Sequence, residues 1–232
     1  MPHPALLRKL IRSAVSIPWT PLDIDGCLIW LDAEDFTSNG AVATWTNKGS
    51  GNDAIQISSG NRPASVLNQQ NGLPVVRFTG TNSTYLSMTP CPILGLTQYT
   101  VLVVHKYSGV ETGDLYSFGT GGVEHATKSD GAVVRDWGAI GTYYTLDAEY
   151  HYITKTYNVG DTPDSTLFDN GISAGVGDTY SPPTGTAAVF GAYSAGLQPM
   201  TGDIAEFICY NTDISVENLA IAHAYLANKW GI

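Results

Sequence analysis

The sequence predicts an all-β protein, an antiparallel two-sheet jelly-roll sandwich with a short N-terminal amphipathic helix and a C-terminal helix. Only 14% of its 232 residues are charged, while Gly, Thr, Ser, Asn and Tyr are plentiful, a composition typical of strands joined by tight turns. Apolar and alternating segments follow one another with turn residues between them. A buried strand followed by a capped helix ends the chain. These three observations favour one large sandwich over two smaller domains.

Predicted strands occupy the first half of the chain in close succession. Residues 26–32 form a buried strand, because Cys-Leu-Ile-Trp-Leu is a continuous apolar run. A second strand covers residues 42–46, before a turn cluster of Gly, Asn and Ser at residues 47–52. Residues 73–78 and 85–88 are predicted to pair as neighbouring strands.

Further strands follow a central core strand that is rich in β-branched residues. Asn-Gly pairs at Asn39, Asn71 and Asn170 predict tight turns, since both residue types tolerate positive φ. The predicted strands, beginning with the central one, are residues 100–106, 115–119, 131–137, 151–157, 165–168 and 187–191.

The end of the chain predicts a strand over residues 202–211 and then a helix with both ends marked. Ser215 is placed to cap the first free amides, and Glu217 lies in the first turn, where the helix dipole favours an anion. Lys229 occupies the last turn, and Gly231 can adopt the left-handed conformation that ends helices. One face of this helix must be covered by the body of the domain, and it consists of Leu219, Ala222, Tyr225 and Leu226.

The order of several short motifs resembles a known family. The motifs are LIWLDA at residues 28–33, NGLPVVRFTG at 71–80, STLFDNG at 165–171, GDIAEFICY at 202–210 and AYLANKWG at 224–231. In order and spacing they are similar to the concanavalin A-like lectin/glucanase family, the laminin-G-like jelly rolls. The resemblance implies a jelly-roll sandwich over residues 22–232 whose first and last strands close against each other.

Composition also excludes several classes of function. The formal net charge of −10 disfavours nucleic acid as a partner. No run of about 18 apolar residues could cross a membrane, and Arg8, Lys9 and Arg12 interrupt the apolar core that a secretory signal would need. Three cysteines without metal-ligand spacing predict buried thiols, although a Cys27–Cys209 bridge stays open if their strands are neighbours.

The sequence predicts a protein that is not an enzyme. Hydrolases of the resembled family carry two carboxylates on one strand, typically Glu-x-Asp-x-x-Glu, and that motif is absent. The nearest fragments, at residues 32–35 and 147–149, lie at predicted strand ends next to loops. Glu206 lies inside the last predicted strand, where a structural hydrogen-bonding role is expected. No zinc pair and no nucleophile elbow occurs.

No cofactor is predicted, with calcium left as an option because members of the resembled family often use it to order loops. Hard cations need about six to eight oxygen ligands, and no single loop supplies them. The weak calcium candidates are Asn52, Asp53, Asn82 and Asp203.

The most informative predicted surface is aromatic. Residues 123–152 combine five large rings with several acidic residues and glycines. Sugar sites need this mixture, a flat ring for the C–H face of the sugar and fixed polar groups for its hydroxyls. The rings are Trp137, Tyr143, Tyr144, Tyr150 and Tyr152, and the binding candidates are Trp137, Tyr143, Tyr144, Asp136 and His125.

The first 21 residues are predicted to form a separate docking arm and a Pro-containing connector. Apolar residues recur at helical spacing opposite basic ones, which indicates a short amphipathic helix. The docking residues are Leu6, Leu7, Leu10, Ile11, Arg8 and Arg12. We expect this arm to bind either a partner or the sandwich itself.

Together these features predict a lectin-like attachment or decoration module of a virion, such as a phage head or tail. It would bind capsid or tail proteins through the arm and a glycan or cell surface through the sandwich, as a monomer or a homo-oligomer. The expected location is a virion surface or the extracellular space. The alternatives are a purely structural decoration protein and a glycoside hydrolase of the same fold.

Overall fold

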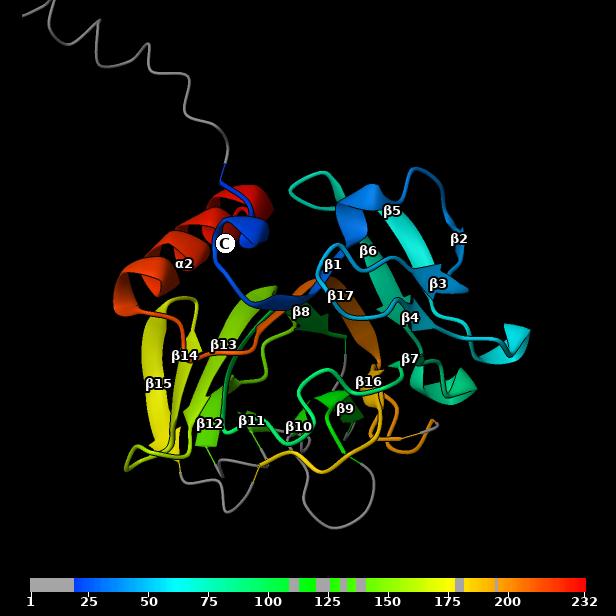
Figure 1. The fold of residues 1–232 in the computed structure, drawn as a ribbon. Helices are drawn as coiled ribbons and strands as arrows, with labels where there is room; N and C mark the ends of the chain where they lie inside the picture. The colour runs from blue at the N-terminus through cyan, green and yellow to red at the C-terminus, as the bar shows by residue number, and fades with distance from the viewer. Residues whose placement is uncertain are drawn as a thin grey trace, which may run out of the picture.

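The structure, a computed structural model, describes residues 19–108, 113–119, 126–129, 133–136, 141–177, 182–194 and 196–232. Within these residues, two antiparallel sheets pack face to face and a helix lies on the outside of one of them (Figure 1). The predicted all-β sandwich is therefore confirmed. The predicted docking residues Leu6 to Arg12 lie outside the described residues.

Sheet A carries the site described below. Its strands are β1 (Cys27–Asp32), β2 (Gly40–Ala41), β5 (Ala64–Gln70), β6 (Leu73–Phe78), β8 (Gln98–Tyr107), β13 (His151–Asn158), β14 (Ser165–Asp169), β15 (Ile172–Gly177) and β17 (Gly202–Tyr210). Their order is β15-β14-β13-β8-β17-β6-β5-β2, and β1 also pairs with β17.

Sheet B forms the opposite layer of the sandwich. Its strands are β3 (Thr44–Trp45), β4 (Ala54–Ile55), β7 (Leu86–Met88), β9 (Gly113–Ser117), β10 (Ala126–Ser129), β11 (Val133–Asp136), β12 (Gly141–Thr145) and β16 (Ala188–Phe190). Their order is β12-β11-β10-β9-β16-β7-β4-β3. Short 3-10 helices at Pro21–Asp23, Ala33–Asp35, Ser59–Asn61 and Gly80–Asn82 lie in the connections.

Strand pairing confirms one expectation and corrects another. The first and last strands do close against each other, with Trp30 of β1 opposite Ile208 of β17. In contrast, β6 and β7 do not pair. The chain passes from one sheet to the other between them, so β6 joins β5 and β17 while β7 joins β4 and β16. Both strands need an apolar face toward the same core, which the sequence pattern alone cannot divide between two sheets.

Two of the three expected Asn-Gly turns are present. Asn71 and Gly72 have φ values of 50° and 77°, and Asn170 and Gly171 have 48° and 76°, so both pairs form left-handed hairpin turns. Asn39 does not, and its carboxamide oxygen accepts a 2.8 Å hydrogen bond from the backbone N–H of Leu67 instead. This contact ties the chain entering β2 to β5.

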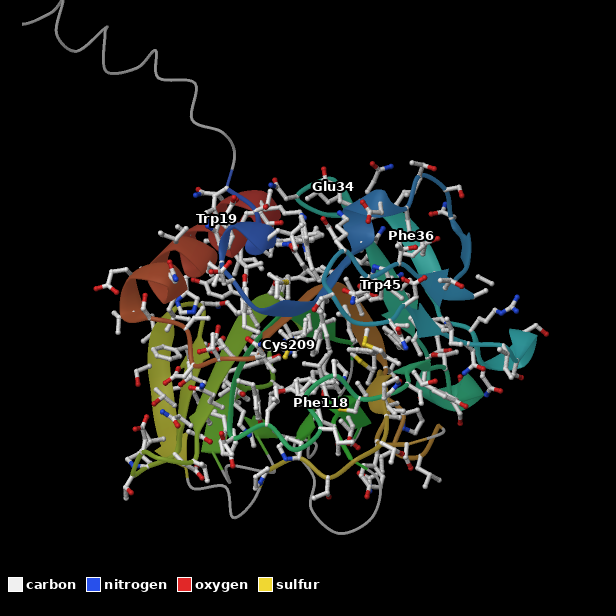
Figure 2. All side chains as sticks on the ribbon, in the orientation of Figure 1. Trp19, Glu34, Phe36, Trp45, Phe118 and Cys209 are labelled. Carbon is white, nitrogen blue, oxygen red and sulfur yellow. The ribbon has the colours of Figure 1, made fainter. Side chains whose placement is uncertain are left out.

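The main core fills the space between the two sheets. Figure 2 shows Cys209 and Phe118 there, and both side chains are fully buried. Cys27 belongs to a different cluster on the outer face of sheet A, although β1 and β17 are neighbours. The two thiols therefore face opposite sides of the sheet, and all three cysteines are free and buried. A Cys27–Cys209 bridge is not formed.

The helix α2 (Val216–Trp230) covers part of the outer face of sheet A and forms a second core with it. Its caps are as predicted, because the Ser215 hydroxyl accepts from the N–H of Asn218 and Gly231 is left-handed with φ 70°. In Figure 1, α2 lies above β13 and β14. Among the described residues, no helix has the length and apolarity needed to cross a bilayer. The buried face of α2 consists of Leu219, Ala222, Leu226 and Trp230.

Glu206 anchors α2 to sheet A. Its side chain is fully buried and accepts 2.7 Å hydrogen bonds from the indoles of Trp30 and Trp230. Tyr225 donates a further bond of 2.8 Å, and the Lys229 ammonium lies 3.2 Å away. Burial raises the pKa of Glu206, while Lys229 opposes that rise. These contacts give Glu206 a structural role, because both of its carboxylate oxygens are occupied by donors from β1 and α2.

Candidate functional site

The predicted aromatic surface is only partly described, and the two tyrosines named as binding candidates are engaged by other side chains of the protein. Tyr143 is 6% exposed and belongs to the core between the sheets, contrary to the stacking role expected for it. Tyr144 stacks on His151, with ring centroids 3.6 Å apart. Its hydroxyl lies 2.9 Å from Nε2 of His105. Trp137 and His125 lie outside the described residues, and only the backbone of Asp136 is described.

The calcium candidates are placed on different parts of the sandwich. Asn52 donates to the carbonyl of Thr89, and the Asp53 carboxylate accepts from the N–H of Asn47, both near sheet B. Asp203 lies on β17 in sheet A, and the side chain of Asn82 lies outside the described set. No group of three or more His, Cys, Asp or Glu side chains within the described ranges could hold a metal ion.

The outer face of sheet A is open beyond α2, and charged side chains stand there in register. Lys106 of β8 lies opposite Asp203 of β17, and Asp203 lies opposite Arg77 of β6. Directly opposite residues on one face of an antiparallel sheet interact closely. All three point outward, because Val104 and Val75, two positions before Lys106 and Arg77, belong to the second core under α2.

Asp203 fixes the arrangement of this row. Arg77 holds it in a two-pronged ion pair, with Nε 2.7 Å from Oδ1 and Nη2 2.9 Å from Oδ2. The Tyr150 hydroxyl donates to Oδ2 at 2.6 Å, and Arg77 also reaches Gln69 at 2.9 Å. The hydrogen bonds that Arg77 donates to Asp203 raise the pKa of Arg77, so the guanidinium stays charged. Paired guanidinium and carboxylate groups of this geometry are rigid.

A cavity of about 490 Å³ opens above this row. Lys106 lies over the face of Tyr150, 5.4 Å from the ring centroid, so an aromatic ring and an ammonium group share one wall. Gln70 forms the border with the covered half of the sheet, because its amide donates to the carbonyl of Trp230 at 2.7 Å. The volume of this cavity lies within the ~300–1,000 Å³ of small-ligand sites. We call the cavity the outer-face pocket.

A histidine cluster holds the turn that delivers Tyr150 to this pocket. His151 follows Tyr150 and faces inward, with Nδ1 2.7 Å from Asp169 and Nε2 3.1 Å from Asp147. Burial by itself would lower the pKa of His151, but Asp169 and Asp147 outweigh burial and raise it. Its cross-strand neighbour His105 is fully buried, and burial lowers the pKa of His105 to about 3.

Sequence reasoning missed Arg77 and Lys106 as site residues, and noted Tyr150 only among five rings. The sequence contains a weak signal for Arg77 and Lys106. Each lies near a strand end, two positions after an apolar residue, and therefore faces the same side of the sheet as that residue. What the sequence does not reveal is the order β13-β8-β17-β6, which brings strands distant in the chain side by side. Asp203, expected as a weak metal ligand, is instead the partner of Arg77.

Comparisons with known proteins show the fold and leave the family open. No family model matches the chain, and no curated protein does. A Trypanosoma rangeli sialidase in complex with sialic acid is similar over 97% of this chain, with a TM-score of 0.58 and 12% identity. The binding domain of botulinum neurotoxin serotype G is similar over 83%, with a TM-score of 0.54 and 8% identity.

A third similar structure is of botulinum neurotoxin type C, in work on cell entry dependent upon interaction with two ganglioside molecules. It matches 89% of this chain with a TM-score of 0.54 and 7% identity. This chain spans 39% of the sialidase chain and 54% and 53% of the two neurotoxin chains. The sandwich is thus a fold shared with parts of a sialidase and of neurotoxin structures.

Proposed function

We propose that this protein is a non-enzymatic, lectin-like module of the concanavalin A-like type that binds glycans in the outer-face pocket. The observation that carries the proposal is the Arg77–Asp203–Tyr150 constellation, in which β6, β17 and the turn before β13 hold the three side chains together. The sialidase complex and the ganglioside-dependent neurotoxin support a carbohydrate ligand by analogy of fold.

The chemistry of the pocket fits a sugar. Sugar hydroxyls both donate and accept, and the pocket places guanidinium and ammonium donors beside amide and carboxylate acceptors. Tyr150 adds an aromatic ring, and its hydroxyl is already fixed by Asp203. Because these side chains are held before a ligand arrives, binding orders few new groups.

The carboxylates of the pocket suit binding better than hydrolysis. A retaining or inverting glycosidase needs one carboxyl that donates a proton and a second that attacks or activates water. Asp203 accepts three hydrogen bonds, two of them from Arg77, and its side chain is 2% exposed. These bonds leave the carboxylate occupied by protein donors, which supports a positioning role for it.

The proposal extends to a virion surface, where the module would attach a particle to glycans of a cell. Support for this placement comes from the sequence, in which an amphipathic basic segment precedes the sandwich. Trp19, the first described residue, lies beside α2 and contacts Tyr225 edge-on at 5.1 Å. An attached segment would therefore leave the sandwich beside α2, at its outer surface.

A glycan array followed by calorimetry on the bound sugars tests the binding function. Tyr150→Ala and Arg77→Lys should each weaken binding by about 1 to 3 kcal/mol, because each removes a fixed group at the centre of the pocket. Ile57→Ala is the matched control, since Ile57 is 86% exposed and lies outside the pocket. Equal binding by all four proteins would contradict the assignment of the site, and the release of reducing sugars would contradict the non-enzymatic reading.

A further inference from the structure

The outer-face pocket contains a second cation, Lys106, whose charge no carboxylate among the described residues neutralises. Within the described part of the chain Lys106 forms no ion pair, and its ammonium contacts only the face of Tyr150, at 5.4 Å. Arg77, by comparison, forms an ion pair with Asp203 through its Nε and Nη2 atoms. An unpaired ammonium in a pocket wall is notable in a protein with a formal net charge of −10.

The neighbouring carboxylate is not available to Lys106. Although Lys106 and Asp203 are directly opposite in register, Oδ1 of Asp203 accepts from Arg77 and Oδ2 accepts from both Arg77 and Tyr150. Asp203 therefore balances Arg77 and leaves the charge of Lys106 uncompensated. Glu149 also lines the pocket, but it is exposed and forms no ion pair with Lys106.

We infer that the pocket selects glycans that carry an acidic substituent, a carboxylate or a sulfate, and that Lys106 is the residue that determines this specificity. The inference rests on the proposed function. The acidic group contacts the Lys106 ammonium, while hydroxyls of the same sugar contact the Arg77–Asp203 pair and its ring lies against Tyr150. A charge-assisted hydrogen bond is stronger than a neutral one, so the acidic sugar gains over its neutral counterpart.

Glu149 provides a further test of the inference, because its negative charge opposes the binding of an acidic glycan. A carboxylate at the edge of the pocket repels an anionic ligand at distances below the Debye length of about 8 Å at physiological salt. Glu149→Gln should therefore strengthen binding of acidic glycans and leave the neutral ones less affected. A pocket built for neutral sugars would show no such difference.

The test uses an array of neutral, carboxylated and sulfated glycans, with a duplicate whose carboxylates are methyl-esterified. Wild-type protein should bind acidic members, and esterification should abolish binding of the carboxylated ones while sparing the sulfated ones. Lys106→Gln should weaken binding of acidic glycans by about 10- to 100-fold, the range of a hydrogen bond to a charged group. Lys106→Arg should keep most of the preference, because it keeps the charge.

Arg62→Gln is the charge-matched control. Arg62 is a cation outside the pocket that donates to the carbonyls of Gln56 and Ile57, and its loss should leave the preference unchanged. If wild-type protein binds esterified and acidic glycans equally and Tyr150→Ala loses that binding, the inference about Lys106 is wrong and the proposed glycan-binding function stands. Absence of any binding, or binding that Tyr150→Ala leaves intact, would overturn the function itself.

Discussion

The outer face of sheet A has two halves that use the same strand, β17, in opposite ways. In the covered half, Glu206 lies under α2 with no exposed surface. In the open half, Asp203 lies three residues earlier on the same strand, and its partner Arg77 is 40% exposed. Both carboxylates accept several donors from other elements. The difference is whether the donors themselves are sealed from water.

This difference separates a carboxylate that stabilises the fold from one that can take part in ligand binding. The donors of Glu206 come from β1 and α2, so the carboxylate and the helix hold each other in place. The donors of Asp203 come from β6 and the turn before β13, and they remain at the wall of a cavity. A carboxylate whose partners stay accessible can position groups for a ligand, whereas a sealed one can only stabilise the fold.

Substitution of Glu206 tests the structural role of the covered half most directly. Glu206→Gln should lower the free energy of unfolding by about 3 to 5 kcal/mol, because its amide NH2 group cannot accept from the Trp230 indole. The substitution also removes one of the two buried carboxylates that pair with Lys229, the other being Asp32 at 2.8 Å. Denaturant unfolding measures the loss. Glu34→Gln is the matched control, since Glu34 also contacts Lys229, at 3.3 Å, but is 55% exposed. It should cost less than about 1 kcal/mol.

A smaller loss of stability is expected in the open half. Asp203→Asn should reduce the free energy of unfolding by about 1 to 3 kcal/mol, since Arg77 can turn to water when its partner is weakened. Binding should suffer more than stability, because both Arg77 and Tyr150 lose the group that holds them. Calorimetry and unfolding on the same preparation separate the two effects. A stability loss as large as that of Glu206→Gln would erase the distinction between the halves.

The sequence predicted the covered half far better than the open one. Local signals mark α2, since Ser215 and Gly231 cap it and its apolar residues recur at helical spacing. The structural role expected for Glu206 also agrees with its contacts. The pocket depends on which strands are neighbours, and no local pattern carries that information.

Strand prediction from the sequence missed β5 of sheet A. β5 was not predicted because its end, Asn-Gln-Gln, lacks an apolar alternation. Those polar residues are explained by place, since Gln69 and Gln70 line the pocket. The aromatic pattern around Tyr143 suggested a surface, although the ring packs inside the sandwich. Rings in a Tyr-rich sandwich carry no mark that tells an inner face from an outer one.

A pH experiment tests how the histidine cluster supports the open half. The raised pKa of His151 means that the folded protein holds this proton more tightly than the unfolded chain. Its contribution to stability is therefore fully present below about pH 6.5 and is lost as the pH rises through the raised pKa. His151→Asn should flatten the decline of stability between about pH 6 and 8.

His223→Gln provides a contrast of opposite sign in this window. Burial lowers the pKa of His223 to about 4, so its contribution to stability grows as the pH rises through the unfolded value of about 6.5. Its loss should therefore shift the slope of stability against pH toward negative values, opposite to the shift expected for His151→Asn. A His151→Asn protein with the wild-type slope would show that Asp147 and Asp169 do not hold a charged imidazole.

The smallest effect is expected at the N-terminal boundary of the covered half. Trp19 contacts Tyr225, whose hydroxyl bonds Glu206, and the carbonyl of Pro21 accepts a 3.0 Å bond from Tyr210. A chain shortened to begin at Pro18 keeps these contacts. If residues 1–17 serve a partner, this chain should unfold within about 0.5 kcal/mol of the full protein, as for changes away from packed features. A chain beginning at Leu22 loses them and should be less stable. Incorporation into particles, measured on the same two chains, should fail for both.

If instead the chain from Pro18 loses several kcal/mol of unfolding free energy, the apolar residues Leu10 and Ile11 pack on the sandwich, because burial of one such side chain contributes about 1.5 to 3 kcal/mol. The covered half would then extend over the arm, and the docking role would be excluded.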